Sequence, residues 1–224
     1  MMHKAVLWDL DDTLYSRREA ARRMFPGMFR ECLYENRSDE FLNEAADYMM
    51  TQVKRNSMTH IDAFHALLER YPADKPFEYN ACFAYYYAHI RSFAKPAEKT
   101  LEILRRLRAQ GVKLAIVTNV IPELLEHQKK KVQDLGIGSL FDAIVYSAEV
   151  DAHKPDRRVF DHAAALLGVT NEECLFVGDD PQSDVDGALG AGMEVVWLDH
   201  WGDVRRFDDV PGVHRVRTLE EYFG

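Results

Sequence analysis

The chain has 224 residues, of which 47% are hydrophobic and 29% charged, a balance typical of a folded protein with one large domain or two small ones. Its formal net charge of −9 argues against nucleic acid or an anionic membrane surface as a partner. No apolar run in the sequence reaches membrane-spanning length, no signal peptide is evident, and the three cysteines are widely spaced. We therefore expect a cytoplasmic protein with reduced thiols, either a monomer or a homodimer.

The first predicted strand is followed by a long helical region. Residues 5–9 form an apolar run that ends in acids, which indicates a buried strand with its carboxyl end at Asp9. Four later segments carry the apolar spacing of helices: 17–34, 39–53, 61–69 and 77–93. Because ligands bind at the carboxyl ends of strands in open α/β sheets, we expect residues 16–95 to form a helical cap above such a site.

From residue 113 onward, predicted strands and helices alternate. The predicted strands are 113–118, 143–146, 174–177, 194–198 and 213–216, and the predicted helices between them are 122–135, 155–167 and 184–191. A short helix is expected after the last strand. This alternation predicts a parallel sheet with helices on both faces, an α/β core formed by residues 1–15 and 96–224.

Polar residues follow four of the predicted strands, at the carboxyl edge of the predicted sheet. They are Asp9 and Asp11, Thr118 and Asn119, Lys154 before Pro155, and Asp179, Asp180 and Asp184. Any one of them alone is an ordinary turn former or helix cap. Since parallel strands end at one edge of the sheet, however, we expect these groups to converge, and that is costly unless a metal ion or a substrate balances their charge.

The chemistry that these side chains can carry out suggests a role for each of them. One of the two carboxylates Asp9 and Asp11 can attack phosphorus, giving an acyl phosphate, while the other transfers a proton. Asp9 and Asp179, with a backbone carbonyl, are oxygen ligands suited to Mg²⁺. The Thr118 hydroxyl can hydrogen-bond a phosphoryl oxygen, and Lys154 supplies a fixed positive charge for the transition state.

The order and spacing of these residues resemble the haloacid dehalogenase-like hydrolase superfamily. Its four motifs are matched by Asp9 to Thr13 (Asp-x-Asp-x-Thr), by the strand ending at Thr118, by Lys154-Pro155, and by Gly178 to Asp184 (Gly-Asp-x-x-x-x-Asp). The resemblance covers residues 5–198. It implies a Rossmann-like parallel sheet with an inserted all-helical cap, as in phosphatase members of the nucleotidase and phosphoglycolate phosphatase type.

The resemblance also implies a role for each matched residue. Asp9 is expected to be the nucleophile and Asp11 the general acid and then base. The remaining expectations are Thr118, Asn119 and Lys154 for phosphate binding, Asp9, Asp179 and the Asp11 carbonyl for Mg²⁺, and Asp184 and Asp180 as supporting residues. The implied activity is Mg²⁺-dependent hydrolysis of a small phosphorylated metabolite through an aspartyl-phosphate intermediate, with a nucleoside monophosphate as the leading substrate, ahead of phosphoglycolate and sugar phosphates.

Other activities remain open at this point. A phosphomutase uses the same nucleophile and acid, and a phosphonate hydrolase needs a lysine in the cap, where Lys54 is the candidate. Asp11 disfavours a haloacid dehalogenase, because carbon–halogen cleavage leaves no group that needs a proton. A phosphoacceptor signalling domain places its acids, threonine and lysine in a different order along the chain.

Overall fold

The computed structural model describes residues 3–53, 61–202 and 204–224. The chain divides into two compact units, Met1–Tyr15 with Pro96–Gly224 and Ser16–Lys95. We call the first the core unit and the second the helical unit. Each is described separately below.

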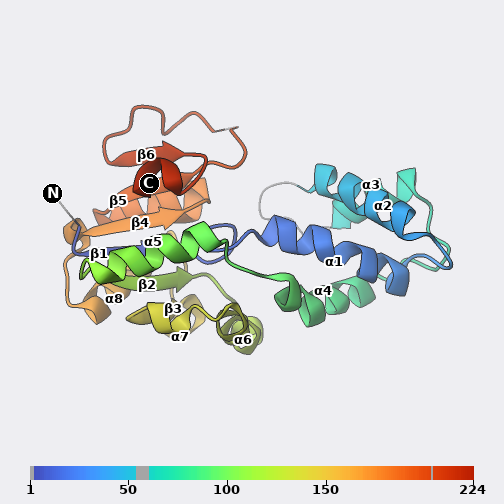
Figure 1. The fold of residues 1–224 in the computed structure, drawn as a ribbon, viewed down its shortest axis with the longest axis horizontal. Coiled ribbons are helices and arrows are strands. Elements are labelled where there is room, and N and C mark those ends of the chain that lie inside the picture. Colours follow the sequence, from blue (N-terminus) through green and yellow to red (C-terminus); the bar gives the residue numbers. More distant parts are fainter. Residues whose placement is uncertain (1–2, 54–60, 203) are drawn as a thin grey trace. The chain divides into compact units, whose positions relative to one another are not determined.

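The core unit contains a parallel sheet of six strands within the described residues (Figure 1). The strands are β1 (Ala5–Trp8), β2 (Lys113–Thr118), β3 (Ala143–Tyr146), β4 (Cys174–Gly178), β5 (Glu194–Leu198) and β6 (Val213–Val216). They are ordered β3-β2-β1-β4-β5-β6, and every neighbouring pair is parallel. Strands β1 and β4 are buried along their whole length, as expected for a sheet covered on both faces.

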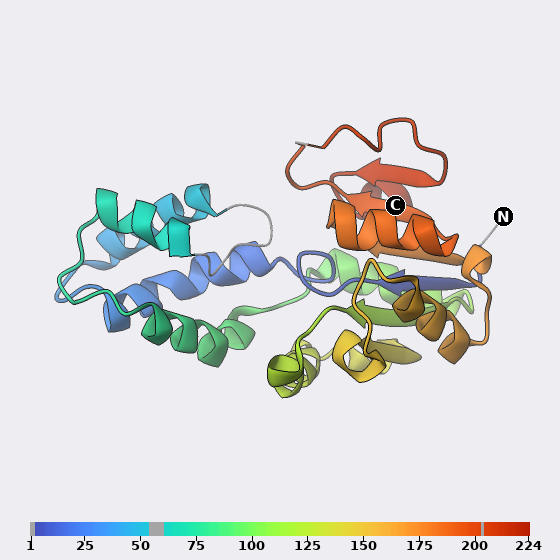
Figure 2. The same ribbon diagram turned by 180° about the vertical axis from the view of Figure 1, so that it is seen from behind.

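Helices cover both faces of this sheet. Figures 1 and 2 show α5 (Glu98–Ala109) on one face and α8 (Arg157–Leu167) with α9 (Gly187–Ala191) on the other. The remaining core helices are α6 (Leu125–Leu135), α7 (Ser147–Val150) and α10 (Glu220–Phe223), with 3₁₀ turns at Pro122–Leu124, Gly138–Leu140 and Asn171–Glu173 and a π-helical segment at Pro181–Asp186. Beneath α8, the rings of Phe160 and Phe176 meet edge to face at a centroid distance of 5.2 Å.

The helical unit consists, in its described part, of α1 (Arg17–Cys32), α2 (Asp39–Gln52), α3 (Ile61–Arg70) and α4 (Tyr79–Phe93). Helix α1 packs against both α2 and α4. Serine hydroxyls cap the first two helices, since Ser16 Oγ accepts from Glu19 N at 3.1 Å and Ser38 Oγ from Phe41 N at 3.2 Å. The rings of Phe25 and Phe29 on α1 are fully buried and stacked on each other.

The predicted fold class is confirmed: a parallel α/β sheet with helices on both faces and an inserted all-helical segment. Several boundaries differ from the prediction. Helix α8 begins at Arg157, not at residue 155, because the Asp156 side chain accepts from Arg158 N and caps it. Residues 181–186, expected in part as the start of an α-helix, are π-helical, and α5 was not predicted at all.

Two further features concern the cysteines and the length of the helices. All three cysteines lie in the described part of the chain and are free thiols, with Cys82 and Cys174 buried. Among the described residues, no helix combines the length and apolar character that crossing a bilayer requires.

Candidate active site

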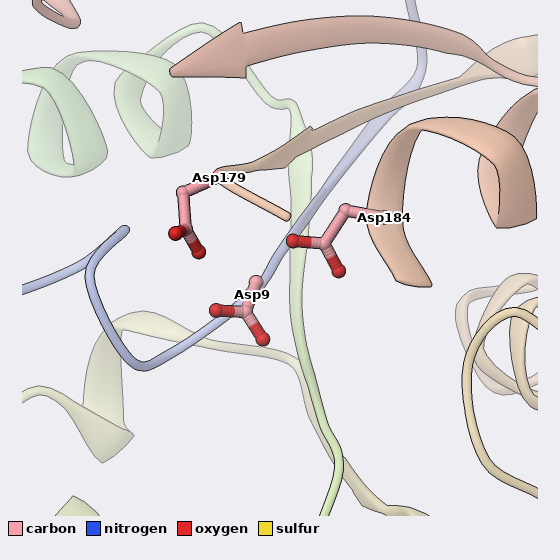
Figure 3. Close-up of side chains that lie close together, drawn as sticks. All are labelled: Asp9, Asp179 and Asp184. Carbon is pink, nitrogen blue, oxygen red and sulfur yellow. The ribbon is translucent and has the colours of Figure 1, made fainter. Parts of the chain in front are cut away.

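Three buried carboxylates meet at the carboxyl edge of the sheet (Figure 3). Asp9 directly follows β1, Asp179 follows the neighbouring strand β4, and Asp184 lies in the π-helical segment that comes next. One oxygen from each carboxylate lies within 4.8 Å of the other two. The position is where the strand order of an open α/β sheet reverses, the usual place for a ligand in such folds.

Lys154 places a buried positive charge beside two of these carboxylates. Its Nζ lies 2.6 Å from Asp9 Oδ1 and 2.7 Å from Asp184 Oδ1. Burial, reinforced by repulsion from Asp184 and opposed by Lys154, raises the pKa of Asp9 to about 7. For Lys154, burial alone would lower the pKa, but the Asp184 and Asp9 carboxylates outweigh it and leave the pKa above its ordinary value.

The chain after β4 holds Asp184 in place. Asp180 N donates to Asp184 Oδ2 at 3.0 Å. The Asp180 carboxylate accepts hydrogen bonds from the backbone N–H groups of Gln182 and Ser183, so it caps the π-helical segment. Gly178 lies so close to Asp184 that an added Cβ would be 2.7 Å from the Asp184 Cβ.

Asn119 connects the end of β2 to the segment that carries Lys154. Its Nδ2 donates to Lys154 O at 3.0 Å, and Lys154 N donates to Asn119 Oδ1 at 2.9 Å. The next residue is also held, because Val120 N donates to the buried Ser147 Oγ at 2.8 Å. Asn119 therefore orients the loop beside Lys154, while its predicted contact with phosphate stays a prediction.

Asp11 and Thr118 are linked through helix α6. The Gln128 side-chain amide donates to Asp11 Oδ2 at 3.0 Å and to Thr118 Oγ1 at 2.8 Å. Lys131 Nζ lies 2.9 Å from Asp11 Oδ1, which also accepts a short hydrogen bond from the Tyr15 hydroxyl. The negative charge of Asp11 contributes to the raised pKa of Asp9, so the two carboxylates interact electrostatically.

Sequence reasoning missed Gln128, Lys131 and the contact of Tyr15 with Asp11. Gln128 and Lys131 lie in the polar run His127 to Lys131, which is typical of a solvated helix face. Their spacing could have indicated that they are buried. The buried positions of α6 share one side of the helix and are Gln128, Lys131, Val132 and Leu135.

The cluster suits a hard divalent cation. Three buried carboxylates offer oxygen ligands, and Lys154 is the cation that contacts two of them. Oxygen ligands of this kind are those that Mg²⁺ prefers, and an added cation would offset the burial and the repulsion that together raise the pKa of Asp9.

Fold and site together define an α/β enzyme whose carboxylates, lysine and hydroxyl gather at the carboxyl edge of a parallel sheet. Residues 6–198 match the family of haloacid dehalogenase-like hydrolases. The chain belongs to this family.

The names of similar proteins indicate which class of hydrolase this chain resembles. Over 98% of this chain and 95% of its own length, a glyceraldehyde 3-phosphate phosphatase from Methanopyrus kandleri is 35% identical. A protein of the same name from Methanocaldococcus jannaschii is 30% identical over the same shares. A solved Bacillus subtilis hydrolase of this family, bound to magnesium, superposes with a TM-score of 0.72 at 20% identity, covering 99% of this chain and 97% of its own. The predicted resemblance to phosphatase members of the family is confirmed.

Proposed function

We propose that the chain hydrolyses phosphate monoesters of small metabolites with Asp9 as a covalent nucleophile. The observation that carries the proposal is the placement of Asp9, a buried carboxylate at the end of the central strand, in contact with Lys154 and two residues before Asp11. The phosphatase names of two relatives that match nearly the whole chain support it.

In the first half of the reaction, a carboxylate oxygen of Asp9 attacks phosphorus. The bond between phosphorus and the leaving oxygen breaks, its electron pair goes to that oxygen, and Asp11 donates the proton that converts it to an alcohol. Thr118 and Lys154 hold the phosphoryl oxygens as the charge spreads over them.

In the second half, Asp11, now a carboxylate, takes a proton from water. The water oxygen attacks the phosphorus of the aspartyl phosphate, and the bond from phosphorus to Asp9 breaks and restores the carboxylate. One phosphate monoester and one water are consumed, and one alcohol and one inorganic phosphate are released.

We assign the metal site to Asp9, Asp179 and the Asp11 carbonyl, with Asp184 as supporting residue. Asp184 joins the same carboxylate cluster, which supports its place beside the ion. When bound, Mg²⁺ supplies positive charge that reduces the repulsion between the nucleophile and the phosphate dianion. In this scheme Lys154 orients Asp9 by contacting one of its oxygens.

For the substrate, we favour a three-carbon sugar phosphate over the nucleoside monophosphate expected from the motif wording. Two relatives that match nearly the whole chain are glyceraldehyde 3-phosphate phosphatases, and this favours the smaller ester. We propose that residues 16–95 act as a cap that selects among such substrates, because the insertion begins directly after the Asp9 to Thr13 loop.

The competing activities lose support to different degrees. Asp11 is present and held by several donors, which favours a reaction with proton transfer over carbon–halogen cleavage. A phosphomutase shares the residues of this mechanism. The lysine that a phosphonate hydrolase would need, Lys54, lies outside the described residues.

The test compares wild-type protein with Asp9→Asn on triose phosphates, nucleoside monophosphates and an aryl phosphate in excess Mg²⁺, with release of inorganic phosphate as the measurement. We expect the wild type to prefer triose phosphate and Asp9→Asn to lose about a thousandfold or more in turnover, as when a covalent nucleophile is removed. A near-normal rate for Asp9→Asn would contradict the assignment of the nucleophile. Preference for a nucleotide would overturn the substrate choice alone.

A further inference from the structure

We propose that Lys131 and Gln128 are positioning residues for the reaction, which hold the acid–base group Asp11 and set the direction of the Thr118 hydroxyl. The inference rests on the proposed function. It assigns to helix α6 a role in proton transfer, although neither residue belongs to the four motifs.

Both residues occupy the buried side of α6. They are three positions apart, so their side chains leave the same side of the helix. The Lys131 side chain is 8% exposed, whereas that of the neighbouring Lys129 is 34% exposed and pairs with Glu126 and Glu149 at the surface. A lysine buried to this degree is costly unless it is paired, and its partner is the Asp11 carboxylate at 2.9 Å.

Gln128 fixes the hydrogen-bonding role of Thr118. A glutamine amide nitrogen can only donate, and it carries two hydrogens. One is directed to Asp11 Oδ2 and the other to Thr118 Oγ1. Because the Thr118 oxygen accepts from Gln128, its own hydrogen is available to donate, which is what a phosphoryl oxygen requires.

Lys131 fixes the orientation of Asp11 itself. Lys131 and the Tyr15 hydroxyl bind Oδ1, and Gln128 binds Oδ2, so the carboxyl group is held at both oxygens. A general acid must present its proton to the leaving oxygen within a narrow range of positions. Loss of these contacts should therefore slow proton transfer without removing the nucleophile.

The test measures kcat/KM of Lys131→Met on two esters, nitrophenyl phosphate and glycerol phosphate. Nitrophenolate leaves readily without a proton, whereas the glycerol oxygen needs one. We expect kcat/KM to fall about tenfold or more for glycerol phosphate and about twofold at most for nitrophenyl phosphate, since general acid catalysis matters only for the poor leaving group. Lys130→Met is the matched control, because Lys130 is exposed on the same helix and should leave both values unchanged.

Two further variants keep the inference testable if Lys131→Met is unstable. Gln128→Met removes the amide donors with little change in volume and should show the same selective loss, and Lys131→Arg should restore part of the rate on glycerol phosphate. Equal losses on both esters, or unchanged values on both, would overturn the positioning role. If Asp9→Asn is inactive while both methionine variants keep the wild-type ratio, only this inference fails. If Asp9→Asn is active, both the proposed function and the positioning role fail.

Discussion

Gly178 shows at the residue scale how closely the backbone approaches the carboxylate cluster. It ends β4, directly before Asp179, and the Asp184 side chain packs against its Cα. Its backbone is not in the left-handed region, so the requirement for glycine here is one of space. The absence of a side chain at residue 178 lets Asp184 reach Lys154.

Gly178→Ala should therefore damage both stability and activity. The new Cβ would lie 2.6 Å from the Asp184 carboxyl carbon, a distance that real contacts avoid, so Asp184 or the strand must shift. We expect a loss of about 1–3 kcal/mol in the free energy of unfolding, typical of an overpacked core position, and a fall in kcat of about tenfold or more. Denaturant unfolding and phosphate release measure the two effects.

Gly190→Ala is the matched control for this substitution. Gly190 lies in α9, and a Cβ there would meet nothing within 4 Å. Alanine should be neutral or stabilise the protein by about 1 kcal/mol or less, because it restricts the unfolded chain and favours the helix. If both alanine variants behaved alike, steric contact with Asp184 would not explain the glycine at residue 178.

The sequence allowed the proximity of several candidate site residues to be predicted, but not the side chains that contact them. The ends of parallel strands converge at one edge of the sheet, so a residue's place at a strand end indicates that it lies near the other strand ends. This reasoning applied to Asp9, Lys154 and Asp179. Gln128 and Lys131 come from the side of a helix, and only the packing of α6 brings them to Asp11. A side chain that acts through a tertiary contact leaves little trace in the local pattern.

At the element scale, the contact between the end of β2 and the segment before α8 organises the site. Asn119 joins the two through hydrogen bonds to both the N–H and the carbonyl of Lys154. The loops at this edge of the sheet are therefore coupled, and the position of the Lys154 ammonium depends on a residue from another strand end.

Asn119→Ala should weaken this coupling. Loss of two hydrogen bonds at a partly exposed position should cost about 1–2 kcal/mol of stability. Because Lys154 would be less well placed, we expect kcat/KM to fall by more than the loss of folding stability alone would explain. Steady-state kinetics measure the first quantity and thermal melting the second. Asn43→Ala removes one hydrogen bond at an exposed position of α2, and it should change stability by less than about 0.5 kcal/mol and leave kcat/KM unchanged. Equal kinetic effects of the two substitutions would exclude a specific role for Asn119.

The strands were predicted more accurately than the helices. Strands β2, β3, β5 and β6 have the predicted bounds. The first three are short, mainly apolar runs followed by polar residues, whereas β6 has the sequence Val-His-Arg-Val. Helix α5 was missed although its buried positions, Thr100, Ile103, Leu104 and Leu107, have helical spacing. That spacing is visible in the sequence alone. The π-helical segment at residues 181–186 could not be predicted, because its geometry follows from Asp180 capping it and Asp184 turning back toward Lys154.

At the scale of the whole molecule, the carboxylates of the proposed metal site all belong to the core unit. Asp9, Asp179 and Asp184 lie within residues 1–15 and 96–224, and within the described residues they form a single group of buried acids. A cation bound there would stabilise the folded core over the unfolded chain, because the three carboxylates come together only on folding.

Addition of Mg²⁺ should therefore raise the unfolding temperature in the absence of any substrate. At a concentration about a hundred times the dissociation constant, one bound ion contributes about 2.7 kcal/mol, which corresponds to a rise of several degrees. We expect a chelator to remove the shift and Asp179→Asn to reduce it strongly. Asp47→Asn is the control, because that exposed carboxylate pairs with Arg22 in the helical unit, and its loss should leave the Mg²⁺-induced shift intact. A wild-type unfolding temperature that is the same with Mg²⁺ and with chelator would show that the cluster does not bind the ion, and the role of Lys154 would then be to neutralise Asp9 and Asp184 unaided.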